Sequence, residues 1–121
     1  MKICITSQGD SLDSQVDPRF GRALNFIIVD TDSMEFEVVV NLNVDGMGGV
    51  GIQSGQLISE KGVKTVLTGN VGPNAFATLN AAKIEVITGV SGEVKNVIDK
   101  FKNGEYKSAQ GPSVDSHSGS K

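Results

Sequence analysis

The apolar residues of the first half form three stretches with strand character, at residues 2–6, 24–30 and 34–42. The first is a short, mostly β-branched run, typical of a strand buried on both faces. In the third, apolar side chains at every second position alternate with more polar ones, which indicates an edge strand with one wet face. Turn-forming residues at 30–33 predict that the second and third strands form an antiparallel hairpin.

The second half alternates between helical and strand patterns. Its predicted elements are a helix from about Ile52 to Lys61 ended by Gly62, a strand at 63–67, a helix beginning at Pro73, a strand at 84–87, and a helix capped by Ser91 and ended by Gly104. Gly51 and Gly55 would let the first of these helices lie close to the sheet.

This order of elements predicts an α/β fold with a five-stranded mixed sheet between helices. Strands joined through a helix run parallel with right-handed crossovers, whereas the hairpin adds antiparallel pairs. The predicted strand order is 3-2-1-4-5, with strand two antiparallel. Strands one and four then lie side by side, and their connections leave in different directions. Ligands bind beyond the carboxyl ends of strands at such a switch point, here at loops 7–23 and 69–74.

The stretch from Val16 to Phe26 ends the first of these loops and begins a strand. Pro18 restricts its own backbone, and Gly21 permits a tight turn or a close approach to its backbone. Arg19 and Arg22 each carry a rigid, permanently charged fork of hydrogen-bond donors. Arginines beside a glycine in a loop favour an anion site. The alternative is ordinary surface charge, and residue types alone do not decide between the two.

Three other features have plain structural interpretations. Gly46–Gly51 matches the pattern G-x-G-x-x-G, but a dinucleotide site needs a buried parallel strand before it and an acid after the next strand. Both are missing here, so the stretch is interpreted as a loop leading into a helix. Cys4 has the character of a small buried residue. His117, the single histidine, lies in a polar tail without a cluster of other metal ligands.

Composition narrows the possible partners. The 121 residues indicate one domain at 1–105 followed by a flexible C-terminal tail at 106–121, which is too polar to bury much surface. The net charge of −3 argues against binding to nucleic acid or to an anionic membrane. No apolar run is long enough to span a membrane, and one cysteine permits no internal disulfide. These features fit a reducing cytoplasm.

Three motifs in sequence order resemble the dinitrogenase iron–molybdenum cofactor biosynthesis family. They are Asp17–Ala23, Gly48–Ile52 and Thr68–Phe76, and the match covers about residues 1–105. The resemblance implies a ribonuclease-H-like, three-layer α/β/α fold, which agrees with the topology above. It also implies roles as cofactor carriers and scaffolds in nitrogenase maturation. One related protein, the orange protein, holds a molybdenum–copper sulfide cluster. Many relatives have a histidine at the position of Arg19, so anion contacts are expected here rather than direct metal ligation.

The expected function is therefore non-catalytic: a carrier or scaffold for a small anionic metal–sulfur cluster (Fe–Mo, Mo–Cu or Fe–S type) or its precursor. Cofactor-assembly or acceptor proteins are the expected partners. The alternative is a small-molecule or nucleotide-binding regulatory module that uses the Gly46–Gly51 loop. The expected site residues are Arg19, Phe20, Gly21, Arg22, Gly69, Asn70, Gly72 and Asn74.

The ribonuclease-H-like fold also raises nuclease activity as an alternative function, but the sequence disfavours it. Two-metal nucleases need several carboxylates at strand ends, and neither 2–6 nor 63–67 carries an acid. Asp10, Asp13 and Asp17 lie in a loop, where solvation is the expected state.

Overall fold

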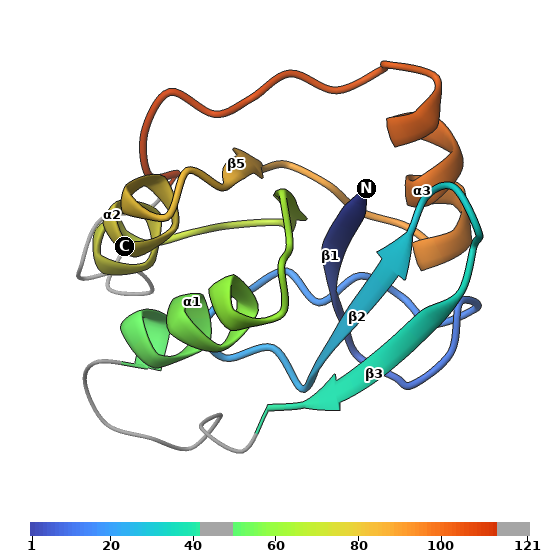
Figure 1. The fold of residues 1–121 in the computed structure, drawn as a ribbon, viewed down its shortest axis with the longest axis horizontal. Helices are drawn as coiled ribbons and strands as arrows, with labels where there is room; N and C mark the ends of the chain where they lie inside the picture. The colour runs from blue at the N-terminus through green and yellow to red at the C-terminus, as the bar shows by residue number, and fades with distance from the viewer. Residues whose placement is uncertain (42–49, 114–121) are drawn as a thin grey trace.

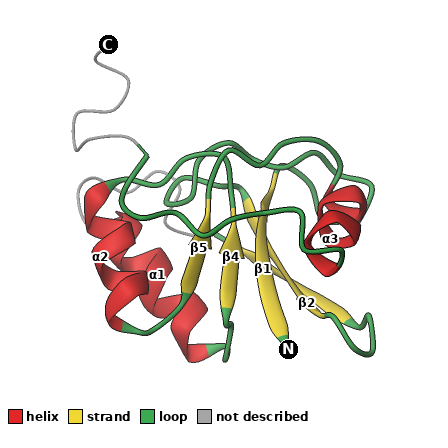
Figure 2. Ribbon diagram, turned by 90° about the horizontal axis from the view of Figure 1, so that it is seen from above, coloured by secondary structure: helices red, strands yellow, loops and turns green. Residues whose placement is uncertain are grey.

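A five-stranded sheet with helices on both faces forms the protein, for which the computed structural model describes residues 1–41 and 50–113. Helices α1 and α2 cover one face and α3 covers the other (Figure 1 and Figure 2). The strand order is β3-β2-β1-β4-β5, which confirms the prediction. The elements are β1 (Lys2–Ser7), β2 (Asn25–Asp30), β3 (Phe36–Val40), α1 (Val50–Glu60), β4 (Thr65–Leu67), α2 (Pro73–Ala81), β5 (Glu85–Ile87) and α3 (Val94–Lys102).

Strand β1 is the centre of the sheet. It pairs antiparallel with β2, where Cys4 lies opposite Ile28, and parallel with β4, where Cys4 lies opposite Val66. The carboxyl ends of β1 and β4 therefore reach the same edge of the sheet. Figure 2 shows the connections that follow β1, β4 and β5 gathered along this edge.

The core has two parts, one on each face of the sheet. Successive side chains of a strand point to opposite faces, so Cys4 packs with the residues under α1 and α2, while Ile3 and Ile5 pack with those under α3. Helix α3 buries Val94 and Ile98 in the second part, because these positions share one helical face.

Cys4 is expected to be structural. Its side chain is fully buried, and this burial raises the pKa of its thiol, so the thiolate that would bind a metal is disfavoured. We expect Cys4→Ala to cost about 1 kcal/mol of unfolding free energy and to leave metal uptake unchanged. Denaturant unfolding and metal loading would measure the two effects. Loss of uptake in a folded variant would instead make Cys4 a ligand.

Three predicted element ends were wrong. Leu24 is 46% exposed and lies before β2 rather than in it. Met34 has a positive φ of 63° in the turn, so β3 begins later than predicted. Ser91 does not cap α3, because the helix begins after Glu93, whose side chain makes no capping hydrogen bond. The Gly92 carbonyl before it instead accepts the N–H of Val16 at 2.8 Å, which fixes the approach to the helix.

Glycine has its predicted role at two helix ends, but not within α1. Gly62 and Gly104 adopt φ values of +77° and +72° after α1 and α3, which confirms them as helix stops. Gly55 brings α1 close to α2 rather than to the sheet. A Cβ atom at Gly55 would lie 2.8 Å from Cγ2 of Thr78 on α2.

The C-terminal segment 105–113 has contacts that its composition did not predict. It runs from α3 past β5 to α2 (Figure 1). The N–H of Ala109 donates to the carbonyl of Val86 in β5 at 2.7 Å, and the N–H of Ser113 donates to the carbonyl of Val71 at 2.9 Å. Since β5 is an edge strand, its outward backbone groups bind this segment without a large apolar surface. Residues 114–121, with His117, lie outside the described residues.

The boundary between domain and tail stays a prediction, and truncation tests it. We expect a chain ending at Lys107 to keep its fold, because all residues of both core parts precede Lys107. It should melt slightly below a chain ending at Ser113, which retains the hydrogen bonds to Val86 and Val71. Thermal unfolding followed by circular dichroism compares them. A large drop in melting temperature for the shorter chain would show that 108–113 belongs to the folding unit.

Candidate functional site

Two loops that are far apart in sequence lie side by side beyond β1 and β4. The N–H of Asn70 donates to the carbonyl of Pro18 at 2.7 Å, and the N–H of Phe20 donates to the carbonyl of Asn70 at 3.1 Å. Arg19 and Asn70 thereby form a short parallel bridge. The strand order predicted this convergence. We call residues 16–24 and 69–74 the paired loops.

Gly69 makes this close approach possible. A Cβ atom at position 69 would lie 2.7 Å from both the Cα and the carbonyl oxygen of Pro18, so any side chain would push the loops apart. Gly72 has no such constraint, since a Cβ atom there would meet no described residue other than its chain neighbours within 4 Å. It is the N-cap residue of α2, with extended backbone and no side-chain cap.

A buried carboxylate shapes the first loop. Asp17 is 1% exposed, and its two oxygens accept the N–H groups of Arg19 at 3.1 Å and Leu24 at 3.2 Å. The first of these bonds is an Asx-turn, which Asp favours two residues before the donor. Nε of Arg19 lies 3.6 Å from the same carboxylate. The prediction that this acid is solvated was therefore wrong: Asp17 is the residue that holds the loop in its shape.

The other two acids of this loop, Asp10 and Asp13, are exposed to solvent, as predicted. Asp13 forms an ion pair with Lys95 of α3 at 2.8 Å. This pair raises the pKa of the Lys95 ammonium, first through its hydrogen bond to Asp13.

Two threonines at the strand ends support the paired loops from below. The Thr6 hydroxyl lies 2.8 Å from the Thr68 hydroxyl and 2.7 Å from the Asp17 carbonyl, which it hydrogen-bonds. Both threonines are fully buried. Sequence analysis missed them, although each is the polar residue at the end of an otherwise apolar strand pattern.

The far side of the first loop is held by residues outside the predicted site. The side-chain amide of Asn41 donates to the carbonyls of Gly21 at 3.0 Å and Ala23 at 2.8 Å. The Ser54 hydroxyl of α1 also donates to Gly21, at 3.3 Å. Gly21 therefore faces these donors with its carbonyl. No local sequence pattern identifies Asn41 and Ser54 as residues that hold this loop, because their contacts with it form only on folding.

The five predicted site residues that carry side chains fall into two groups. Phe20 is 1% exposed and its ring lies 5.6 Å from that of Phe26, so its side chain belongs to the core and only its backbone faces the paired loops. The exposed residues are Arg19, Arg22, Asn70 and Asn74. The side-chain amide of Asn70 also reaches the Pro18 carbonyl, at 3.4 Å, so Asn70 helps to join the loops.

Helix α2 starts from the second of the paired loops. Pro73 at its first position has no N–H, and the carbonyl of Gly72 accepts the N–H of Phe76 at 3.0 Å. Asn74 and Ala75 lie in the first turn, where N–H groups have no acceptor within the helix. The paired loops thus combine two guanidinium groups with the positive end of a helix dipole.

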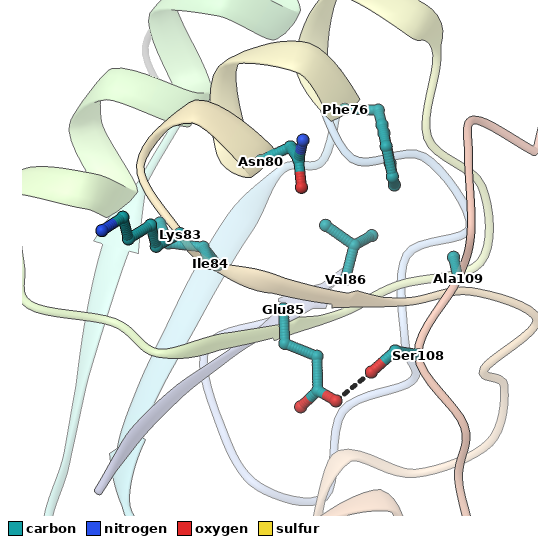
Figure 3. Close-up of a pocket in the computed structure, with 8 residues that line it drawn as sticks. All are labelled: Phe76, Asn80, Lys83, Ile84, Glu85, Val86, Ser108 and Ala109. Atoms are coloured by element: carbon teal, nitrogen blue, oxygen red, sulfur yellow. Dashed lines mark hydrogen bonds between the residues drawn. The ribbon is translucent and has the colours of Figure 1, made fainter.

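A separate hollow of about 350 Å³ lies between α2, β5 and the C-terminal segment (Figure 3). Phe76 and Val86 form apolar parts of its wall. Figure 3 shows Lys83 pointing away from it and the Glu85 carboxylate hydrogen-bonded to Ser108. None of the residues that line this hollow in the described part of the chain belongs to the paired loops.

The described residues contain neither a metal-binding cluster of side chains nor a membrane-spanning helix. No three histidine, cysteine, aspartate or glutamate side chains lie close enough together to hold a metal ion. No helix in 1–41 or 50–113 has the length and apolar character needed to cross a membrane. The predicted Gly46–Gly51 site lies outside the residues whose side chains are described.

Comparisons with known proteins agree with this architecture. The structure of the apo form of the orange protein from Desulfovibrio gigas is 40% identical, with a TM-score of 0.89, over 92% of this chain and 94% of that chain. A putative NifB protein from Thermotoga, solved by NMR, is 41% identical, with a TM-score of 0.78, over 88% and 91%. An uncharacterised protein of Methanocaldococcus jannaschii is 30% identical over 110 residues, which are 88% of this chain and 90% of that protein.

The family model described as dinitrogenase iron-molybdenum cofactor matches residues 1–104. This range contains every element of the sheet, all three helices and both of the paired loops. The chain therefore belongs to the dinitrogenase iron–molybdenum cofactor family.

Proposed function

We propose that this protein is a non-catalytic carrier or scaffold for a small anionic metal–sulfur cluster, or its precursor, bound at the paired loops. The observation that supports this best is the backbone bridge between Arg19 and Asn70, which joins an arginine-bearing loop to the N-terminus of α2. Membership of the cofactor family supports the same cargo class.

The donors at the paired loops suit an anion. The Arg19 side chain is 58% exposed, and its ion pair with Asp17 among the described residues uses only Nε, at 3.6 Å. Arg22 is exposed three residues further on. Guanidinium groups and helix N-termini both bind anions through N–H donors. Thiometallate clusters are anions, so these residues can hold one without providing metal ligands.

Binding without a protein ligand suits a carrier, because the cargo leaves intact once a partner binds it more tightly. Cys4, the one cysteine, lies fully buried inside the sheet and is therefore not placed to ligate a cluster at the paired loops. We accordingly propose cofactor-assembly or acceptor proteins as partners and a reducing cytoplasm as the location.

Anaerobic reconstitution tests the proposal. The purified protein is incubated with tetrathiomolybdate, with copper(I) and tetrathiomolybdate, or with iron and sulfide, and then desalted. We expect visible absorbance and a stoichiometric metal content by elemental analysis after at least one treatment. Loss of that colour in Gly69→Ala, but not in Gly72→Ala, would assign it to the paired loops. A protein that stays colourless, and instead releases an ultraviolet-absorbing ligand on denaturation, would favour the nucleotide-binding alternative.

A further inference from the structure

The outer backbone edge of β3 has no partner strand among residues 1–41 and 50–113. The N–H of Asp30 donates to Glu35, and the N–H of Asn41 donates to Leu24, so the β3 positions that face β2 are odd-numbered. Hydrogen-bonded and outward positions alternate along an antiparallel pair. Phe36, Val38 and Val40 therefore point their N–H and carbonyl groups away from the sheet, where the described residues offer them no partner.

The same three residues carry an apolar stripe. They share the α3 face of the sheet, because the residues opposite them on β2, Val29, Ile27 and Asn25, lie on that face. Phe36 is 44% exposed and Val40 is 60% exposed, while Val38 is partly buried against the core. The sequence pattern predicted one solvent-exposed face and one buried face for this strand. In the structure, the apolar face is solvent-exposed at both ends of the strand, at Phe36 and Val40. Neither proline nor lysine, which commonly protect edges, occurs in β3.

We propose that β3 pairs with β3 of a second copy of this chain, antiparallel and centred on Val38, so that the two sheets form one continuous sheet. In this register Val38 lies opposite itself and Phe36 lies opposite Val40 of the second copy. All three outward positions then form hydrogen-bonded pairs, each of which exchanges two backbone hydrogen bonds. The aromatic and β-branched side chains meet across the strands, a favourable pairing.

Charge favours this register over the one centred on Glu37. In the register centred on Val38, Glu37 lies opposite Val39 of the second copy and Glu35 lies opposite its Asn41. No acidic side chain therefore lies opposite another. A register centred on Glu37 places this carboxylate opposite Glu37 of the second copy. Like charges that lie directly opposite one another destabilise a sheet. The sequence of β3 thus pairs with itself without opposing charges. This self-complementarity favours a second copy of the chain over a different protein as the partner of β3.

The mass of the full-length protein across a concentration series tests the proposal, measured by analytical ultracentrifugation. We expect a reversible dimer. Val38→Pro removes an N–H that points outward, so the ladder between β2 and β3 stays complete and the melting temperature should stay near that of the wild type. The dimer dissociation constant should rise by about tenfold or more, since two interface hydrogen bonds are lost in the symmetric pair.

A charge exchange tests the register independently of stability. Phe36→Lys alone and Val40→Glu alone should each weaken the dimer. The double variant should recover it, because only the register centred on Val38 places the new ammonium opposite the new carboxylate. Both positions are well exposed, so the fold should tolerate them. A wild-type protein that stays monomeric throughout the series overturns the proposal, as does a double variant no stronger than either single variant. Either result would leave cluster binding at the paired loops unaffected.

Discussion

Gly69→Ala is expected to abolish cluster uptake and to lower the unfolding free energy by about 1–3 kcal/mol, the usual cost of overpacking. The added Cβ would lie 2.7 Å from Cα and the carbonyl oxygen of Pro18. Both are backbone atoms, so relief requires the loops to separate. Separation breaks the hydrogen bonds that join Asn70 to Pro18 and Phe20, and it moves Arg19 away from α2. Denaturant unfolding and metal analysis after reconstitution measure the two losses.

Gly72→Ala is the matched control for this prediction. It adds the same methyl group three residues away, where no described residue beyond the chain neighbours lies within 4 Å and the φ of −83° suits alanine. We expect its uptake to equal that of the wild type and its stability to change little. Equal damage in both variants would show that the loop tolerates no side chain for reasons unrelated to Pro18. Full uptake in Gly69→Ala would contradict the role of loop pairing in binding.

Arg19→Gln or Arg22→Gln should weaken the binding of an anionic cluster by about tenfold or more. A hydrogen bond to a charged group contributes about 1.5–3 kcal/mol, and about 1.4 kcal/mol corresponds to a factor of ten. Stability should change little, because both arginine side chains are exposed and the Asp17 carboxylate keeps its hydrogen bonds from the N–H groups of residue 19 and Leu24. Titration with tetrathiomolybdate, followed by absorbance, gives the affinities, and thermal unfolding gives the stability.

Lysine is the conservative comparison at both arginine positions. It keeps the charge but lacks the planar fork, so Arg19→Lys and Arg22→Lys should restore only part of the affinity. If the glutamine variants lost stability and affinity together, the arginines would be structural and would hold the loop to the sheet. If affinity stayed unchanged in both, the paired loops would not be the site, and the Gly46–Gly51 loop would become the next candidate.

Local pattern was sufficient to predict the order of the elements and the arrangement of the sheet. The hairpin of β2 and β3 follows from turn residues between two apolar runs, and the parallel half follows from strands separated by helices. Handedness rules leave few ways to combine these units. The side-by-side position of the loops after β1 and β4 is a direct result, so the location of the candidate site was predictable, as were its exposed arginines.

The tertiary structure alone decided which loop residues build the site and which are exposed within it. Asp17 has the same local character as Asp10 and Asp13, yet only Asp17 is buried, because the N–H groups that need its oxygens come together there. Gly69 and Gly72 are equally permissive in sequence, and Pro18, about fifty positions earlier, makes only one of them essential. These roles depend on atoms that folding brings together, which a local sequence pattern does not contain.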